Sequence, residues 1–182
     1  MIKTYTTIST NWGCMAAVWS DTGLWALSFP QADESRAMAD CERQCGETAD
    51  WSEHITEKIR SFSELLTQQI KIYWQGFAVD FSVPIDWRGY TSFQRAVLQY
   101  TATIPYGQTK TYRQTAEAAG SPRAARAAGG ALHINRTPIV IPCHRVVGSN
   151  GNLTGFGGGL EMKKALLLLE SGEYVAQRTD NI

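Results

Sequence analysis

The sequence predicts a two-part α/β fold. A small N-terminal α/β domain, with an antiparallel sheet and a helix, precedes a mostly helical C-terminal domain with a helix-turn-helix of the winged-helix kind. Residues 2–29 are typical of strands, whereas the hydrophobic pattern becomes helical after residue 86. The chain has 182 residues, of which 43% are hydrophobic, enough for one large or two small domains with a real core. We place the domains at 1–85 and 86–175, with a tail at 176–182.

The N-terminal sheet is predicted from two apolar-rich runs. These runs, Met15–Trp19 and Leu24–Phe29, flank the sequence Ser20-Asp21-Thr22-Gly23. Small and polar turn residues between two such runs indicate a hairpin. Residues 31–50 are polar and predict a variable loop or a short helix.

One longer helix and one more strand complete the predicted N-terminal domain. Ser52 is expected to cap a helix that ends near Gln69, because apolar residues then recur on one helical face. Residues 77–83 alternate between apolar and polar side chains and predict a strand. Residues 84–89 are interpreted as a segment that crosses to the second domain.

Three helices are predicted in succession after this segment. Ser92 opens the first, and a turn at 104–107 ends it. The second extends over 111–119 and is stopped by the following glycine. The third is expected to begin at residues 121–122, where serine at the N-cap and proline at the first helical position form a favourable pair, and to end near residue 134. Two short helices joined by a tight glycine turn suggest a helix-turn-helix.

The third helix has unusually small side chains. From Ala124 to Ala131 they are almost all Ala or Gly, with Arg126 standing alone. Such a helix can approach another surface closely, and that surface is either DNA or another helix of the same protein. Arg123 and Arg126 favour DNA.

Charge is distributed unevenly along the chain although the formal net charge is +0. Residues 91–150 carry seven Lys/Arg and one acidic residue, whereas residues 31–80 carry ten Asp/Glu and five Lys/Arg. The basic part is suited to a polyanion, while the acidic part keeps the molecule in solution. Chance segregation of charge is the alternative.

No membrane segment or secretory leader is predicted. No run approaches the roughly 18 apolar residues that span a bilayer, and the N-terminus lacks the apolar core of a signal peptide. We therefore expect a cytoplasmic protein with reduced thiols. Cys41 and Cys45 have helical spacing and could bind a metal with Cys14 and His54, but this is not a recognised zinc spacing, so we predict structural thiols and no metal.

The most reactive segment follows a β-branched run. Residues 139–141 predict a buried strand, which Pro142 breaks just before Cys143, His144 and Arg145. A thiol attacks carbon as the thiolate, so His144 is a candidate base, and Arg145 either adds positive field or anchors the loop. Neighbouring side chains of a strand point to opposite faces, so a bridging water or a turn at Pro142 is needed to connect the thiol with the imidazole.

Residues 93–170 resemble the O6-alkylguanine-DNA alkyltransferases, and the overall size is similar to the stand-alone bacterial form. The matching pieces keep the family's order and spacing: Ile104-Pro105-Tyr106-Gly107, Thr111-Tyr112, Arg126-Ala127-Ala128-Gly129-Gly130-Ala131, Asn135, Ile141-Pro142-Cys143-His144-Arg145-Val146-Val147, the glycine-rich loop 155–159 and a Leu-rich helix ending at Glu170. The resemblance implies direct reversal of DNA damage. An alkyl group moves from O6 of guanine to Cys143, irreversibly and once per molecule.

The resemblance also implies roles for the reacting groups. Cys143 is the alkyl acceptor, His144 acts through water as the base, and Glu170 orients the imidazole. Asn135 is the hinge that ties the helix-turn-helix to the active-site turn. No metal or organic cofactor is required.

The remaining implied roles concern the substrate. Arg126 enters the duplex and fills the gap left by the rotated base, while Tyr112 donates to a ring nitrogen of guanine and the backbone carbonyls of Val146 and Cys143 accept its exocyclic amine. The expected DNA contacts come from one helix and one loop: Arg123, Arg126, Ala127, Ala128, Gly129 and Ser149. The expected partner is double-stranded DNA that contains O6-alkylguanine, bound by a monomer.

Two departures from the family pattern stand out. Phe156 and Gly157 occupy positions where members often have tyrosine and serine, so the aromatic pocket wall is kept but a hydroxyl is lost. Arg136 follows Asn135 where members often have proline.

Two other function classes remain open from the sequence. A binder that recognises alkylguanine without transfer would lack an acceptor cysteine. A cysteine hydrolase or acyltransferase using Cys143 and His144 would need an oxyanion hole, which backbone amides of residues 157–159 could supply.

Overall fold

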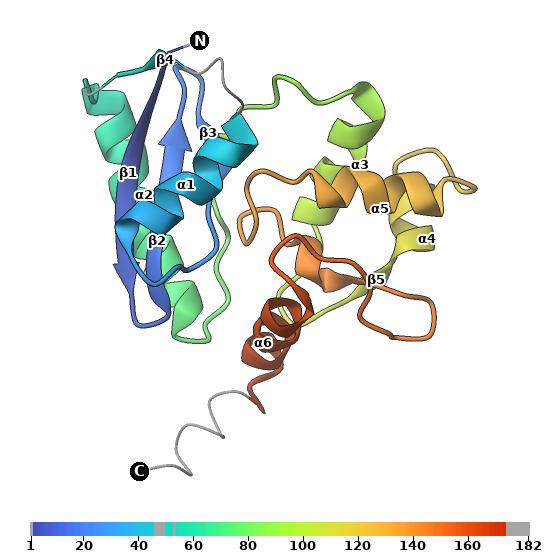
Figure 1. The fold of residues 1–182 in the computed structure, drawn as a ribbon. Helices are drawn as coiled ribbons and strands as arrows, with labels where there is room; N and C mark the ends of the chain where they lie inside the picture. Colours follow the sequence, from blue (N-terminus) through green and yellow to red (C-terminus); the bar gives the residue numbers. More distant parts are fainter. Residues whose placement is uncertain (1, 46–49, 53, 174–182) are drawn as a thin grey trace. The chain divides into compact units, whose positions relative to one another are not determined.

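The computed structural model describes residues 2–45, 50–52 and 54–173. The chain divides into two compact units (Figure 1). The first comprises Met1–Arg88 together with Arg136–Pro138, and the second comprises Gly89–Asn135 and Ile139–Ile182. The return of three residues to the first unit is not predicted by the sequence. The predicted tail at 176–182 lies outside the described residues. No helix in the described part is long and apolar enough to cross a membrane.

The first unit is built on a four-stranded sheet of order β3-β2-β1-β4. β1 (Ile2–Thr10), β2 (Gly13–Trp19) and β3 (Leu24–Leu27) are antiparallel neighbours, and β4 (Asp50–Trp51) pairs in parallel with β1. The predicted hairpin between β2 and β3 is confirmed, since Ser20 N donates to Gly23 O at 2.9 Å.

Two helices cover opposite faces of this sheet (Figure 1). Successive side chains of a strand alternate between faces, so Ala16 and Val18 of β2 pack against α1 (Glu34–Cys45). On the other face Met15 lies against α2, where its sulfur accepts a hydrogen bond from Trp74 Nε1 at 3.4 Å. β2 is therefore buried on both sides, as its continuous apolar run requires.

α2 begins later than predicted. It extends over Glu57–Trp74, with Thr56 as the N-cap, whose side chain accepts from Ile59 N. The prediction of Ser52 as the cap is wrong because Ser52 donates its backbone N–H to Lys3 O at 2.8 Å, beside β4. Residue 52 is therefore hydrogen-bonded to the sheet, and the helix begins only after it.

The predicted strand at 77–83 is also wrong. Gln69 of α2 binds this segment, with Nε2 donating to Asp80 O at 2.9 Å and to Ser82 Oγ at 3.2 Å. Phe77, one of the alternating apolar residues, is 60% exposed. Residues 77–83 lie against α2 and do not join the sheet. Their alternation of apolar and polar side chains therefore does not mark a buried face.

The edge of β3 is covered by two segments from elsewhere in the chain. Leu24 exchanges backbone hydrogen bonds with Pro84 O at 2.8 Å and Asp86 N at 2.9 Å. Leu27 N donates to Arg136 O at 2.8 Å. These bonds satisfy the open edge and fix residues 84–86 and 136 on the first unit.

The second unit is mostly helical, which confirms the predicted fold class apart from the helix-turn-helix, which stays a prediction. α3 (Ser92–Ala102) packs against α4 (Tyr112–Ala118), α5 (Ala125–His133) and the 3-10 helix η1 (Cys143–Arg145), and α6 (Leu160–Ser171) packs against η1. A small parallel ladder joins β5 (Lys110–Thr111) to β6 (Val146–Val147). α4 and α5 occupy the positions predicted for the helix-turn-helix, whose role in binding stays a prediction.

Capping explains the starts of α3 and α4 but not that of α5. Thr91 and Thr111 each form a capping box with the glutamine three residues later. The predicted start of α5 at Ser121 is wrong, because Ser121 N donates to Ala116 O at the end of α4 and Ser121 O accepts from Ala124 N. These bonds make a separate turn, and the helix begins only at Ala125.

Residues 139–141 are buried as predicted but do not form a strand. Residues 139 and 140 lie in a turn, and Ile139 has φ of 73°. A positive φ is costly for a β-branched side chain and is incompatible with a strand. The apolar run therefore reflects burial alone.

Candidate active site

A tight turn at Pro142 sets the direction of the chain just before Cys143. Pro142 has φ −79° and ψ 64°, and Cys143 N donates to Ile141 O at 2.8 Å, which together make an inverse γ-turn. Cys143, His144 and Arg145 then form η1. The turn at Pro142 expected from the sequence is therefore present. In a 3-10 helix, neighbouring side chains do not point to opposite faces as they do in a strand.

Asn135 is hydrogen-bonded to the thiol. Its Nδ2 donates to Cys143 Sγ at 3.1 Å and to Ile141 O at 2.9 Å. One amide thus contacts both the reactive sulfur and the backbone before Pro142. Asn135 follows the C-terminal end of α5, so the helix and the reactive turn share this residue.

The sulfur itself is enclosed. Cys143 is 7% exposed, and burial raises the pKa of its thiol, against the lowering effects of the Asn135 hydrogen bond and of the positive charge on Lys163. The resting group is therefore the thiol, not the thiolate. Its reaction with carbon requires a base at the moment of attack.

His144 and Glu170 provide a buried base and its partner. His144 Nε2 lies 2.7 Å from Glu170 Oε1, and the imidazole is fully buried. Burial lowers the pKa of His144 more than the carboxylate raises it, so the imidazole is neutral near pH 7. Nε2 then carries the proton and donates to Glu170, which leaves Nδ1 with the lone pair that can accept a proton.

Arg145 holds the carboxylate of Glu170 in place. Its Nε donates to Glu170 Oε2 at 2.9 Å, its Nη2 donates to Oε1 at 2.9 Å, and its Nη1 donates to Ile104 O at 2.5 Å. Gly107 N also donates to Glu170 Oε2, at 3.1 Å, and its φ of 71° explains the glycine. Of the two roles expected for Arg145, the geometry supports that of anchor.

A cavity of about 590 Å³ lies beside α4 and α5. Four of the predicted substrate and DNA residues line it, namely Tyr112, Arg126, Gly129 and Ser149. The remaining lining residues are Thr111, Arg113, Ala125, Gly130, His133, Thr154 and Gly155. Cys143, Val146, Phe156 and Gly157 are outside this lining as the described residues define it, so the predicted site falls into two groups, one inside and one outside the lining.

α5 presents different residues on its two faces. Arg126 and Ala127 of α5 are exposed, as is Arg123 in the turn before it, whereas Ala128 is fully buried. The side chain of Ala128 packs on the inner face of α5, so its burial gives no support to the expected contact with DNA, which stays a prediction. The small residues of α5 thus allow close helix packing on one face and leave an open surface on the other.

Lys163 connects the two groups and was missed by the sequence reasoning. It is fully buried in α6, and its Nζ donates to Val146 O at 2.7 Å and Thr154 O at 3.2 Å. The same Nζ lies 5.7 Å from the Tyr112 ring centroid and 5.8 Å from that of Phe156. Its helical spacing from buried Leu166 and Glu170 is the signal that could have revealed it.

Phe156, Gly157 and Tyr112 differ in burial and in hydrogen bonding. Phe156 is half-buried, whereas Gly157 is exposed. Tyr112 Oη donates to Thr154 O at 3.1 Å, which ties the loop before Phe156 to α4. The Val146 carbonyl, expected to accept from guanine, accepts here from Lys163.

The other cysteines are not gathered with metal ligands in the described part of the chain, where no three His, Cys, Asp or Glu side chains cluster. Cys14 and Cys41 form no disulfide with another cysteine of the described residues, and Cys41 Sγ donates to Ala16 O at 3.3 Å inside the core. The side chain of Cys45 lies outside the described residues.

Comparisons with known proteins identify the family. Residues 92–172 match the family described as 6-O-methylguanine DNA methyltransferase, DNA binding domain. A methylated-DNA–protein-cysteine methyltransferase from Mycolicibacterium paratuberculosis is 47% identical over 124 residues, which cover 68% of this chain and 74% of the relative. The crystal structure of Mycobacterium tuberculosis O6-methylguanine methyltransferase is 34% identical, with a TM-score of 0.70 and 94% of each chain covered. A structure of the M. tuberculosis protein in complex with DNA is 33% identical, with a TM-score of 0.70, and covers 93% of this chain and 94% of that one. This chain therefore belongs to the methylated-DNA–protein-cysteine methyltransferase family.

Proposed function

We propose that this protein repairs duplex DNA by transferring an alkyl group from O6 of guanine to its own Cys143, once per molecule. The observation that carries the proposal is the arrangement of Asn135, Cys143, His144 and Glu170, in which a buried thiol has a hydrogen-bond donor and a neutral, carboxylate-bound imidazole follows it in the chain. Membership of the family indicates that the substrate is alkylated guanine, and the DNA complex of the M. tuberculosis relative supports a DNA partner.

The reaction exchanges one bond for another. Cys143 Sγ attacks the alkyl carbon, the S–C bond forms and the bond from carbon to O6 breaks. His144 Nδ1 accepts the thiol proton, directly or through water, while Glu170 holds the opposite ring nitrogen. Guanine leaves with its electron pair on O6 and receives a proton at a ring nitrogen from Tyr112, and the proton held by His144 restores the balance through solvent.

The substrate base must first leave the duplex. O6 lies within the base stack, so the nucleotide is rotated out at a cost of a few kcal/mol. Arg126, exposed on α5 beside the cavity, is placed to fill the vacated position, because a guanidinium can stack on bases and donate to the orphaned partner. Arg123, Ala127, Gly129 and Ser149 remain the proposed DNA contacts around it.

We propose that entry of the base shifts the loop around residue 155. Tyr112 Oη now donates to Thr154 O, and Cys143 lies outside the cavity lining. We propose that guanine takes over the hydroxyl of Tyr112, which releases the loop and opens the path to the sulfur. Lys163 then faces both the base and Val146 O. Phe156 forms an apolar wall, and Gly157 leaves room for larger alkyl groups.

The product is a thioether, which has no easy leaving path. None of the steps above calls for a metal or an organic cofactor. We also propose that the protein acts as a monomer in the cytoplasm, where its thiols stay reduced.

Intact-mass spectrometry tests the proposal. After incubation with duplex DNA containing O6-methylguanine, the protein is expected to gain one methylene unit of mass, on the peptide that contains Cys143 and no more than once. Cys143→Ala should gain nothing while still binding DNA, and Cys14→Ala, which removes another free thiol, should react as the wild type does.

The same experiment separates the other function classes. DNA binding without any mass gain would indicate a non-transferring damage binder. Repeated turnover of an ester substrate that Cys143→Ala abolishes would indicate a cysteine hydrolase.

A further inference from the structure

The residue directly after Asn135 is held by the first unit. Arg136–Pro138 belong to that unit, whereas Asn135 and Ile139 belong to the second. Leu27 N of β3 donates to Arg136 O at 2.8 Å, and Thr137 is 1% exposed. The chain is thus fixed on the first unit immediately beside the residue that contacts the reactive sulfur.

The side chain of Arg136 adds further contacts to this attachment. Its guanidinium carbon lies 3.8 Å from the ring centroid of Trp25, the distance of a close cation–π contact. Its Nη2 donates to the backbone oxygens of Asp86 at 3.2 Å and Arg88 at 2.7 Å. A planar, permanently charged fork can make these contacts together, and a shorter side chain cannot.

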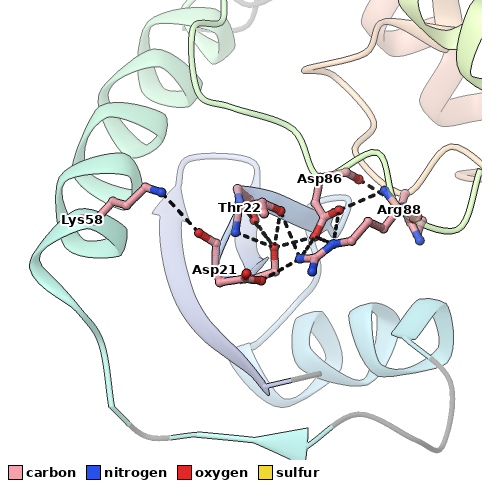
Figure 2. Close-up of polar contacts among 8 residues, drawn as sticks. Asp21, Thr22, Lys58, Asp86 and Arg88 are labelled. Atoms are coloured by element: carbon pink, nitrogen blue, oxygen red, sulfur yellow. Dashed lines mark hydrogen bonds and ion pairs between the residues drawn. The ribbon is translucent and has the colours of Figure 1, made fainter.

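The carbonyls that receive Arg136 are themselves held by a polar network (Figure 2). The buried carboxylate of Asp86 accepts from Ser20 Oγ at 2.6 Å and from Arg88 N at 2.9 Å. Figure 2 shows Arg88 reaching the β2–β3 turn as well, where Nη2 donates to Asp21 Oδ1 at 2.7 Å and Thr22 Oγ1 at 3.0 Å. The hairpin turn therefore fixes the acceptors, and the acceptors fix Arg136.

On the other side of this attachment lies the reactive turn. Asn135 Nδ2 donates to Ile141 O and Cys143 Sγ, so the position of its backbone sets the hydrogen bond to the sulfur. Ile139, just after the attached segment, has φ of 73°. Such a conformation of a β-branched residue persists where the surrounding structure imposes it.

We propose that Arg136 is a positioning residue for the reaction of Cys143. By fixing the backbone next to Asn135, it holds the amide that donates to the sulfur. An N–H donor stabilises the thiolate relative to the thiol and so opposes the effect of burial on the thiol. The inference rests on the proposed function where it concerns alkyl transfer, and on the thiol alone where it concerns reactivity.

The test compares Arg136→Ala with Arg136→Lys and with the matched control Arg43→Ala, which removes an exposed arginine from α1 of the same unit. Two rates are measured on the full chain. One is transfer from free O6-benzylguanine, and the other is alkylation of the Cys143 peptide by iodoacetamide as a function of pH.

Arg136→Ala is expected to slow both reactions by about 2- to 30-fold, the range of couplings carried between neighbouring sites, and to displace the iodoacetamide profile to higher pH. Arg136→Lys should recover part of the loss, because it retains the cation over Trp25. Arg43→Ala should match the wild type in both rates.

An Arg136→Ala protein with a lowered melting temperature but wild-type rates and a wild-type pH profile would overturn the proposal, because the residue would then serve stability alone. If Arg136→Ala fails to fold, Arg136→Gln carries the same test. A wild type that reacts with iodoacetamide but not with O6-benzylguanine would contradict the proposed function, and the pH profile would still decide the role of Arg136.

Discussion

Glu170→Gln removes one charge from a buried polar cluster of the second unit. The carboxylate is 1% exposed and accepts from Arg145 and Gly107 N while binding His144. Glutamine keeps the shape of the side chain but turns one acceptor oxygen into a donor NH2. That group faces N–H donors wherever it is placed, and the guanidinium of Arg145, itself 8% exposed, loses its counter-charge.

The expected loss of stability is large. Removing one partner of a buried ion pair costs about 3–5 kcal/mol, because the remaining charge stays buried. For a chain of this size each kcal/mol lowers the melting temperature by about 2–4 °C, so we expect a fall of roughly 6–20 °C. Urea unfolding followed by tryptophan fluorescence measures the free energy. Glu161→Gln is the matched control, since it makes the same change at an exposed site of the same helix.

The pH dependence gives an independent measure of the same pair. Burial alone would raise the pKa of Glu170, but the hydrogen bonds from His144 and Arg145 and the charge of Arg145 outweigh it and lower this pKa from 4.5 to about 2. A carboxyl whose pKa is lower in the folded state stabilises the fold above its unfolded pKa, and this contribution disappears as the pH falls from 4.5 towards 2. It amounts to about 3 kcal/mol. Glu170→Gln should lose this dependence and Glu161→Gln should keep it.

Similar behaviour of Glu170→Gln and Glu161→Gln would contradict this prediction. Equal free energies of unfolding at neutral pH and parallel slopes between pH 4.5 and 2 would mean that Glu170 is solvated, and that His144 is oriented by something else.

Three further predictions concern the thiol, the duplex and the charge of the second unit. Because burial raises the pKa of Cys143, alkylation by iodoacetamide should keep accelerating beyond pH 9, and Asn135→Ala should shift the profile further upward; a plateau below pH 8 would contradict this. Arg126→Ala should slow repair of duplex DNA at least about tenfold more than reaction with free O6-benzylguanine, and equal losses in both assays would argue against base extrusion. DNA affinity measured by fluorescence anisotropy should fall steadily with salt concentration, as phosphate contacts require, and a flat response would exclude them.

Local signals in the sequence were sufficient for elements whose partners lie nearby. The β2–β3 hairpin depends on a four-residue turn, and α3 and α4 depend on caps that act within three residues. The Pro-Cys-His-Arg segment likewise marks the reactive turn without knowledge of the fold. Such features need no information about distant residues.

The failures arose where a distant partner decides the local structure. Ser52 has the chemistry of a cap but bonds to β1, and residues 77–83 alternate like a strand but follow Gln69. Residues 139–141 are apolar because they are buried between Asn135 and the reactive turn, not because they pair with another strand. A β-branched sequence alone does not distinguish these cases.

Part of the site depends on such long-range contacts as well. Glu170 was assigned from resemblance, but its contacts with Arg145 and Gly107 required the fold. Lys163 looks like an ordinary charged residue of an exposed helix until its burial is known. The hold on Arg136 combines three segments far apart in the sequence, so no motif marks it.

The enclosure of Cys143 bears on how long an unused molecule stays competent. Oxidants consume sulfurs that are ionised and accessible, and this one is neither in the resting protein. A protein that reacts only once benefits from a thiol that stays reduced until its substrate arrives.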